Sequence, residues 1–311
     1  MPHRVLVARE LKGLLEPSQL VDLDITWVAA GEPTPKGDYV AIVPLLSRWV
    51  GGTEFKSLPN LRIVANVAVG YNNVDVVAAE MRGVIVTNTP GVLTDATADL
   101  TWALLLATAR RLVEGVDLVR SGKWTGWHPH QLLGLELRGR TLGLLGAGRI
   151  GQAVGRRAPG FGLRILYTAR TAKPDFERDT GATRVELSRL LSESDIVSLH
   201  VPSSPETKGI INPETLGQMK PGAILINTSR GDLVREEALA QALEDGQLGA
   251  AGLDVYTDEP AIHPRLLAAP RTVLLPHIGS ATEETRRKMA TIAVANVQCV
   301  LGGKPPLTPV F

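Results

Sequence analysis

Short apolar runs alternate with more polar segments along most of the chain. In the first third of the sequence, such runs occupy residues 4–8, 25–29, 39–45, 61–69 and 84–87. In the remainder they occupy residues 141–145, 164–168, 196–200, 223–227, 249–255 and 272–275, with helical segments such as residues 186–192 and 236–245 between them. Strands that alternate with helices in this way predict an α/β protein with parallel sheets and right-handed crossovers.

Two longer segments predict helices of a different kind. Residues 94–120 follow a Thr-Pro-Gly turn and carry apolar side chains one helical turn apart, which predicts one long helix between two domains. Residues 280–301 repeat the same spacing and are followed by Gly302 and Gly303, which end helices readily. We therefore expect the last helix to stop at about residue 301.

Residues 121–135 interrupt the regular pattern and are rich in glycine, tryptophan and proline, so we expect an irregular loop. Its tryptophans, Trp124 and Trp127, either contact another protein surface or fold back on their own domain. His128 and His130 lie in the same segment, but no cysteine or carboxylate stands at ligand spacing. The sequence therefore predicts no metal site.

Length and charge narrow the class of protein. A chain of 311 residues exceeds the size at which a single core usually stops growing, which indicates about two domains. The formal net charge of +1, without runs of like charge, gives no reason to expect nucleic acid or a membrane as partner. Cys299 is the single cysteine, and no charged-then-apolar leader follows Met1, so a cytoplasmic protein without a disulfide is expected.

A glycine-rich turn follows the apolar run at residues 141–145. Gly146, Gly148 and Gly151 have G-x-G-x-x-G spacing and precede a helical segment at residues 149–157, which Pro159 should end or kink. In dinucleotide-binding folds the three glycines permit the turn, the approach of the pyrophosphate and close packing of the helix on the strand. A turn without a ligand is the alternative, but the next strand arrives where a ribose-binding strand should end. The sequence therefore predicts a dinucleotide site.

A second glycine break, at Val69 and Gly70, follows the apolar run at residues 61–69. At the carboxyl end of a strand in an open α/β sheet, its backbone N–H groups would lie where ligands bind. The alternative is an ordinary turn in which Gly70 supplies an unusual φ angle.

Three residues suited to catalysis also follow predicted strands. Arg230 follows residues 223–227, Glu259 follows residues 249–255, and His277 follows residues 272–275. Each alone has a simple structural explanation, as a surface charge, a turn residue and a buried imidazole. Together at one edge of a sheet, they suit reduction of a ketone, which needs a proton donor near neutral pH, a carboxylate to orient the imidazole, and a planar cation to bind a carboxylate or carbonyl.

The chain resembles the D-isomer-specific 2-hydroxyacid dehydrogenase family over nearly its whole length. The matching motifs are Gly146-Ala-Gly-Arg-Ile-Gly151, Leu199-His-Val-Pro202, Met219-Lys-Pro-Gly-Ala-Ile-Leu-Ile-Asn-Thr-Ser-Arg-Gly231, Gly252-Leu-Asp-Val-Tyr-Thr-Asp-Glu-Pro260 and Leu275-Pro-His-Ile-Gly-Ser280. The resemblance implies that Arg230, Glu259 and His277 are the catalytic residues. It also implies that Asp254 borders the nicotinamide and that the amides of Val69 and Gly70 bind the substrate carboxylate.

The same resemblance implies two Rossmann-like or flavodoxin-like domains with parallel sheets and a cleft between them. The substrate domain would be discontinuous, with residues 1–94 and 280–311, and residues 95–279 would form the dinucleotide-binding domain. The cofactor is expected to contact the glycine loop, the second strand and the loops that follow later strands, at Gly146, Gly148, Arg149, Ile150, Gly151, Thr168, Ala169, Arg170, His200, Val201, Pro202, Thr207, Thr228, Ser229, Asp254 and Gly279.

Within the family, the chain is most similar to the glyoxylate/hydroxypyruvate reductases, notably at residues 67–75, 124–129 and 167–170. This implies reduction of a small 2-oxo acid, with Trp127 of a neighbouring subunit of a homodimer narrowing the substrate site. Other 2-hydroxyacid dehydrogenases, such as a short phosphoglycerate dehydrogenase, remain alternatives, although no regulatory domain follows Phe311. A non-enzymatic dinucleotide-sensing corepressor is a further alternative.

The end of the second predicted strand bears on coenzyme choice. NAD sites usually place a carboxylate about 20 residues beyond the glycine loop, where it binds the ribose hydroxyl and repels a 2′-phosphate. Here Thr168 takes that place, and Arg170 follows two residues later, with Thr171 supplying a further hydroxyl. These donors favour NADPH, while the lack of a repulsive carboxylate leaves NADH possible.

Overall fold

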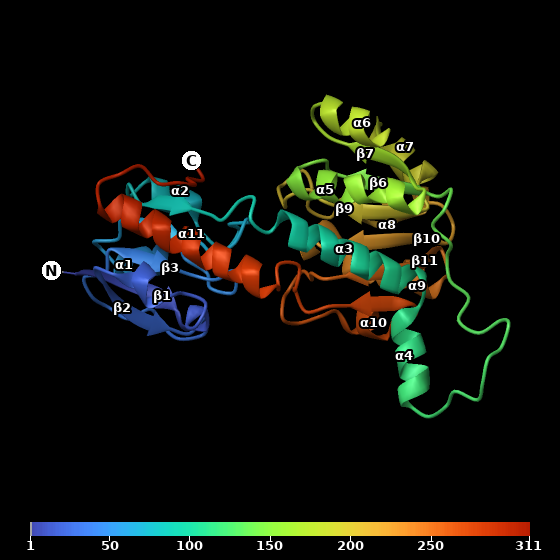
Figure 1. Cartoon of the computed structure of the whole chain (residues 1–311), viewed down its shortest axis with the longest axis horizontal. Helices are drawn as coiled ribbons and strands as arrows, with labels where there is room; N and C mark the ends of the chain where they lie inside the picture. Colours follow the sequence, from blue (N-terminus) through green and yellow to red (C-terminus); the bar gives the residue numbers. More distant parts are fainter. Residues whose placement is uncertain (1) are drawn as a thin grey trace. The chain divides into compact units, whose positions relative to one another are not determined.

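The computed structural model describes residues 2–311, which form two compact units (Figure 1). The first unit runs up to Leu93 and resumes at Ser280–Phe311, and the second is Thr94–Gly279. Each unit contains one parallel sheet with helices around it. The α/β fold with two parallel-sheet domains predicted from the alternating pattern is thereby confirmed.

The first unit has a five-stranded sheet in the order β2-β1-β3-β4-β5, in which every neighbouring pair is parallel. Its chain order therefore reverses between β1 and β3, as in flavodoxin-like folds. The strands are β1 (His3–Ala8), β2 (Leu23–Val28), β3 (Ala41–Val43), β4 (Ile63–Ala65) and β5 (Ile85–Thr87). The helical elements are η1 (Arg9–Leu11), η2 (Pro17–Leu20), α1 (Gly52–Ser57), α2 (Val76–Glu80) and α11 (Glu283–Leu301).

The predicted strand at residues 61–69 was too long, because the sheet ladder ends at Ala65. Beyond that residue the backbone turns to other partners. The Val67 N–H donates to Pro44 O at 3.0 Å, and the Ala68 N–H donates to Asn66 O at 2.9 Å. The segment after β4 is therefore a bent loop at the carboxyl edge of the sheet.

Helix α11 returns the chain to the first unit and packs against β3 and β4. Thr282 caps its N-terminus by accepting a hydrogen bond from the Thr285 N–H, and its buried face includes the predicted positions Ala290, Ala293, Val294 and Val297. The helix ends at Leu301, as the two following glycines predicted. The remaining tail then runs beside β5, where the Val310 N–H donates to Val86 O at 2.9 Å.

The second unit has a seven-stranded sheet in the order β12-β11-β10-β9-β6-β7-β8, again with only parallel neighbours. The order reverses between β6 and β9, as in dinucleotide-binding folds. The strands are β6 (Thr141–Leu145), β7 (Arg164–Thr168), β8 (Thr183–Arg184), β9 (Ile196–Leu199), β10 (Ala223–Asn227), β11 (Leu248–Leu253) and β12 (Thr272–Leu274). The helices are α3 (Thr94–Ala109), α4 (Leu112–Arg120), α5 (Arg149–Arg157), α6 (Pro174–Thr180), α7 (Leu187–Glu193), α8 (Pro213–Gln218), α9 (Glu236–Glu244) and α10 (Pro264–Ala268), with η3 (Ala158–Phe161) and η4 (Gly231–Leu233).

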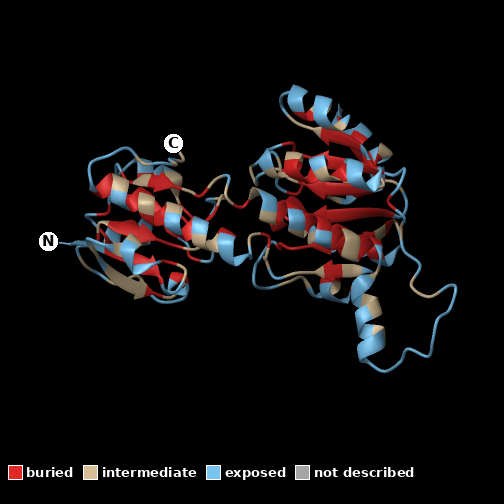
Figure 2. Cartoon of the chain, viewed as in Figure 1, coloured by how far each residue is buried: buried red, intermediate tan, exposed pale blue. Residues whose placement is uncertain are grey.

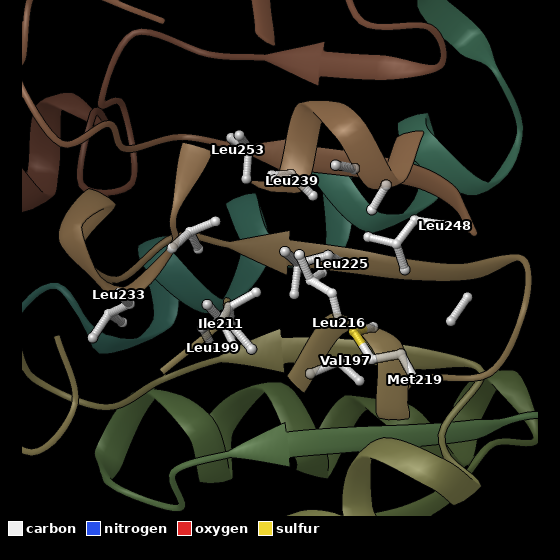
Figure 3. Packing of buried hydrophobic residues seen from close by; sticks show 14 of the residues in the cluster. Val197, Leu199, Ile211, Leu216, Met219, Leu225, Leu233, Leu239, Leu248 and Leu253 are labelled. Carbon is white, nitrogen blue, oxygen red and sulfur yellow. The ribbon is translucent and has the colours of Figure 1, made fainter. Parts of the chain in front are cut away.

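The central strands of this sheet are buried on both faces (Figure 2). One face carries a cluster of branched apolar side chains from β9, β10 and β11, covered by α8 and α9, and includes Val197, Leu199, Leu216, Leu225, Leu239 and Leu253 (Figure 3). On the other face, α3 packs against β10, β11 and β12. This double cover explains why the strands appear in the sequence as continuous apolar runs.

The long helix predicted for residues 94–120 is wrong, because the chain breaks between α3 and α4. Arg111 adopts the left-handed conformation with φ of 54°. Ala109 O, which a continuous helix would bond to the N–H four residues on, instead accepts from the Leu135 N–H at 2.8 Å. A contact from across the following loop therefore ends α3.

A smaller prediction concerns the length of helix α5. Helix α5 ends at Arg157 and continues only as the short 3₁₀ turn η3, which contains Pro159, so the early end predicted from that proline is confirmed. Within residues 2–311, no helix is both long and apolar enough to cross a membrane.

Candidate active site

The three glycines after β6 each meet a different steric requirement. Gly146 has φ of 103°, and a Cβ there would lie 2.6 Å from His200 O, so the turn needs a residue without a side chain. A Cβ on Gly151 would collide with Gly146 O, which shows how closely α5 approaches the end of β6. Nothing lies within 4 Å of a Cβ built on Gly148, so its backbone faces open space. This arrangement fits a pyrophosphate beside Gly148.

The N-terminus of α5 begins at that open glycine. Gly148 is its N-cap residue and has no side chain to satisfy the free N–H groups of the first turn. Arg149 is exposed and Ile150 is half-buried, in the first turn of α5. The free amides and the positive end of the helix dipole together suit an anionic ligand.

The loop after β7 presents a cation without a carboxylate nearby. Thr168 ends β7, and Ala169 and Arg170 follow. Arg184 of β8 holds this loop, since its Nε donates to Ala169 O at 2.9 Å and its Nη2 donates to Arg170 O at 3.2 Å. The Arg170 side chain is exposed and bonds to no other side chain or carbonyl within residues 2–311. Its guanidinium is therefore available for an anionic ligand.

The loops after β9 and β10 are bonded to one another. Ser229 Oγ donates to Val201 O at 2.6 Å. Within the first loop, Thr207 Oγ1 donates to Pro202 O at 2.7 Å, and in the second the Thr228 hydroxyl lies 2.8 Å from that of Thr101. The predicted residues of these two loops thus lie together beside the glycine turn.

His200, which directly follows β9, is a neutral imidazole. Burial lowers the pKa of His200 to about 4, so the ring carries no proton charge at neutral pH. Its Nε2 lies 2.9 Å from Ser198 Oγ. His200 is therefore unsuited to act as the proton donor.

His277 and Glu259 form a direct pair. His277 Nδ1 lies 2.7 Å from Glu259 Oε2, and the second carboxylate oxygen accepts from the Tyr256 N–H at 3.0 Å. Burial by itself raises the pKa of Glu259, but the hydrogen bonds from His277 and Tyr256 and the nearby charge of Arg230 bring that pKa below its usual value. The carboxylate is thus ionised and can only accept, so Nδ1 carries a hydrogen and Nε2 is the atom left for a substrate.

The segment that carries His277 is held by Asp254. Its two carboxylate oxygens accept from the N–H groups of Ile278 and Gly279, each at 2.8 Å. Burial raises the pKa of Asp254, while these bonds oppose the rise. His277 itself has φ of 55°, a conformation that is uncommon outside glycine. Asp254 therefore fixes the backbone on which the imidazole stands.

Arg230 occupies the loop after β10. The Asn227 side chain spans this loop, because its Nδ2 donates to Arg230 O at 2.8 Å and its Oδ1 accepts from the Ser229 N–H at 3.0 Å. Burial lowers the pKa of Arg230, and the charges of Glu259 and Asp232 oppose that change. A guanidinium remains charged in proteins, so a partly desolvated cation stands within electrostatic range of the His277–Glu259 pair.

In the first unit, the loop after β4 holds its carbonyl groups inward. Ala68 O accepts from the Thr89 N–H at 2.8 Å, Val69 O from Asn88 Nδ2 at 2.7 Å, and Gly70 O from Asn66 Nδ2 at 2.9 Å. In a trans peptide the N–H points opposite to the carbonyl, so the Val69 and Gly70 N–H groups point away from these partners. Neither N–H has a hydrogen-bond partner within the described residues. Two adjacent free amides suit an anion such as a carboxylate.

Trp127 stands apart from this arrangement. Its side chain is 83% exposed in the loop that follows α4, and Trp124 is 53% exposed. Trp127 is left almost uncovered, so the interpretation that it folds back on its own domain is wrong, whereas Trp124 is about half covered. Their predicted contact with another surface stays a prediction.

Sequence reasoning missed the asparagines that shape these loops. Asn66 follows β4, Asn88 follows β5 and Asn227 ends β10, and each amide donates to a carbonyl of a predicted site loop. One feature of the sequence could have identified them, because each of the three asparagines stands at the end of an apolar run.

Comparisons with known proteins agree with this geometry. The sequence profile described as the D-isomer specific 2-hydroxyacid dehydrogenase, NAD binding domain, matches residues 102–279. A glyoxylate reductase of Thermococcus onnurineus is 50% identical over 275 residues, which cover 87% of this chain and 82% of that protein.

Two solved structures are similar over the whole chain. The TT0316 protein of Thermus thermophilus has a TM-score of 0.89 and 46% identity, with 99% of this chain and 100% of that chain covered. An NADPH-dependent glyoxylate/hydroxypyruvate reductase of Sinorhizobium meliloti, in complex with NADP and malonate, has a TM-score of 0.86 and 35% identity, with 100% and 97% covered. The resemblance found in the motifs is confirmed: the chain belongs to the D-isomer-specific 2-hydroxyacid dehydrogenase family and is an NAD(P)-dependent oxidoreductase that acts on CH–OH groups.

Proposed function

We propose that this enzyme reduces glyoxylate, and also hydroxypyruvate, to the corresponding 2-hydroxy acid, with NADPH as the preferred cofactor. The observation that carries the proposal is the His277–Glu259 pair, which leaves His277 Nε2 as a proton donor in the unit that carries the glycine turn. The names of the similar proteins, glyoxylate reductase and glyoxylate/hydroxypyruvate reductase, support the choice of substrate.

Each residue of the proposed site has its own role in the reaction. We assign recognition of the substrate carboxylate to the Val69 and Gly70 amides of the first unit, and to Arg230 the binding of the carboxylate and polarisation of the carbonyl. When bound beside Gly148, the dinucleotide supplies the hydride. His277 Nε2 donates a proton to the carbonyl oxygen as negative charge develops there, and Glu259 stabilises the imidazolium before that transfer. The first unit is then the substrate domain and the second the dinucleotide domain.

A steady-state assay of NADPH oxidation tests this proposal. Glyoxylate and hydroxypyruvate should give higher kcat/KM than pyruvate or phosphohydroxypyruvate. Turnover of phosphohydroxypyruvate above both would instead identify a short phosphoglycerate dehydrogenase. Cofactor binding without turnover of any 2-oxo acid would identify a dinucleotide-sensing protein.

Glu259→Gln is expected to shift the pH dependence of reduction to lower pH. The pKa of the Glu259 carboxylate is below its usual value, so at neutral pH the carboxylate is charged and stabilises the protonated His277. Glutamine keeps the shape without the charge, so the interaction that favours the imidazolium is gone and reduction should fall off earlier as pH rises. The measurement is kcat/KM for glyoxylate across pH 5–9 (about the range in which histidine titrates). Asp258→Asn removes an exposed charge one residue away and should leave the profile in place; identical profiles for Glu259→Gln and wild type would refute the pairing.

The preference for NADPH rests on the loop after β7. Thr168 places no carboxylate against a 2′-phosphate, and Arg170 offers a guanidinium without a protein partner among the described residues. A charge-assisted hydrogen bond contributes about 1.5–3 kcal/mol, or on the order of ten- to a hundredfold in affinity.

Arg170→Ala is therefore expected to lower kcat/KM for NADPH by on the order of tenfold or more, with little change for NADH. Arg178→Ala, on α6 of the same unit, removes another exposed cation, one that pairs with Asp175, and serves as the control. The measurement is the ratio of kcat/KM with NADPH to kcat/KM with NADH, in the wild type and in both variants. A wild type that favours NADH, or an NADPH preference undiminished in Arg170→Ala, would contradict the assignment of Arg170 to the 2′-phosphate of NADPH.

We also propose that the enzyme is a homodimer in which α4 and the loop after it contact the second copy. The apolar side chains Leu112, Val116 and Val119 fall at helical spacing on α4, and all are exposed. Trp124 and Trp127 on the adjoining loop are exposed as well, and exposed apolar side chains that recur along one stretch are usually covered by a partner.

Trp127→Ala is expected to relax the preference for glyoxylate over bulkier 2-oxo acids, because the indole is proposed to narrow the substrate site of the neighbouring subunit. The measurement is the ratio of kcat/KM for glyoxylate to that for a longer 2-oxo acid. Leu267→Ala, at another exposed apolar residue of the same unit, on α10, is the control and should not change the ratio. A monomer in sedimentation velocity would exclude the contribution in trans.

A further inference from the structure

The free amides after β4 depend on a chain of contacts that begins at the far end of the sequence. The peptide between Val69 and Gly70 has its carbonyl bonded to Asn88 Nδ2 at 2.7 Å. Because that peptide is planar and trans, the same bond sets the direction of the Gly70 N–H. Whatever holds Asn88 therefore also orients this N–H.

Asn88 is held by the C-terminal tail. Its N–H donates to Thr308 O at 3.2 Å, and the Thr308 hydroxyl donates to Asn88 O at 2.6 Å. Two bonds between one pair of residues fix the backbone of Asn88 on both sides of its side chain. They join positions 220 residues apart in the chain.

Thr308 is in turn held by Asn296 of α11, a side chain that is fully buried. Asn296 Oδ1 accepts from the N–H groups of Leu307 and Thr308 at 2.8 and 3.1 Å. Its Nδ2 donates to Thr308 Oγ1 and to Ile292 O, each at 2.9 Å. Three of the four hydrogen bonds of this amide hold the tail and the fourth goes to its own helix, so no donor or acceptor is left over and the attachment is a specific one.

The other side of the loop is held independently. Asn66 and Asn73 form a reciprocal amide pair, with Nδ2-to-Oδ1 distances of 3.1 and 3.0 Å, and Asn66 Nδ2 also holds Gly70 O. With Gly70 O fixed, loss of the Asn88 contact would release one peptide, not the whole loop. A change at Thr308 should therefore act on a single N–H.

We propose that Thr308 is a positioning residue for substrate binding: through Asn88 it directs the Gly70 N–H towards the substrate carboxylate. The proposal rests on the carboxylate site assigned to these amides above. It makes the C-terminal tail part of the substrate-binding apparatus, and it leaves the cofactor site in the other unit untouched.

Thr308→Val removes the hydroxyl at nearly constant volume and is expected to raise the KM for glyoxylate by about three- to tenfold, as for loss of one or two ordinary hydrogen bonds. The value of kcat and the dissociation constant of NADPH should change by less than about twofold, on the same scale. Thr308→Ser, which keeps the hydroxyl, should restore the wild-type KM. Thr291→Val, at an exposed threonine of α11, is the matched control, and its KM should equal that of the wild type.

A general loss of structure would lower the melting temperature and affect NADPH binding as well, so thermal unfolding and cofactor titration accompany the kinetics. A KM in Thr308→Val within twofold of wild type, or an equal rise in Thr308→Ser, overturns the proposal. Calorimetric titration with oxalate, which carries the carboxylate but is not reduced, separates this result from the proposed activity. Weaker oxalate binding in Thr308→Val alone supports the positioning role even if glyoxylate proves not to be the substrate, and unchanged binding contradicts it.

Discussion

His277→Ala is expected to lower kcat for glyoxylate reduction by about 10²–10⁴-fold, the usual contribution of a positioned general acid. The imidazole is held by Glu259 at 2.7 Å, and its backbone is fixed by the bonds from Ile278 and Gly279 to Asp254. Alanine removes the proton donor without removing these backbone contacts. Binding of NADPH, measured by fluorescence titration, should stay close to that of the wild type.

The matched control is His3→Ala, which removes an exposed imidazole at the start of β1 and should leave kcat unchanged. His277→Gln adds a second comparison, since an amide fills part of the space but cannot act as an acid near neutral pH. If His277→Ala turns over at near the wild-type rate while holding the cofactor, another group supplies the proton and the assignment fails.

Arg230→Lys is expected to lower kcat/KM by about 10²–10³-fold, as when one preorganised donor is removed from a developing negative charge. Lysine keeps the charge, but it lacks the planar fork that binds a carboxylate and a carbonyl together. The backbone of this loop is set by Asn227, which contacts residues 229 and 230 through its own side chain, so the fold of the loop should survive the change.

Two readouts separate binding from catalysis in this variant. A rise in KM alone would assign Arg230 to the carboxylate, whereas an equal fall in kcat and kcat/KM would assign it to the carbonyl in the transition state. Arg271→Lys, directly before the edge strand β12, is the control for a general sensitivity to lysine. Wild-type kinetics in Arg230→Lys would exclude both roles.

The parts of the fold that were predicted correctly depend on local patterns. The strand, turn and helix around Gly146 follow from a short glycine spacing, and the proximity of Arg230, Glu259 and His277 follows because each stands just after an apolar run. The helix break at Arg111 could not, because it depends on the Leu135 N–H competing for Ala109 O. No pattern within α3 itself records that competition.

The loop after β4 illustrates the same limit. The apolar composition of residues 61–69 indicates a long strand, yet the ladder stops at Ala65, and the carbonyls of Val69 and Gly70 bond to the side chains of Asn88 and Asn66. The partner of Asn88 is Thr308, 220 residues away. Hydrophobic periodicity carries no information about such polar contacts between distant segments.

The hydrogen bond from Leu135 N to Ala109 O has a consequence for how this enzyme can vary. It brings the two ends of the segment 110–134 together at the base of α3, and Gly134 lets them meet, since a Cβ there would collide with Ala109 O. Residues 110–134 therefore leave the end of α3 and return to the same place. A chain with a shorter or different segment here would keep the strands that precede Arg230, Glu259 and His277, so the dimer contact and the substrate size selection that we propose for this segment could change while those three residues stay in place.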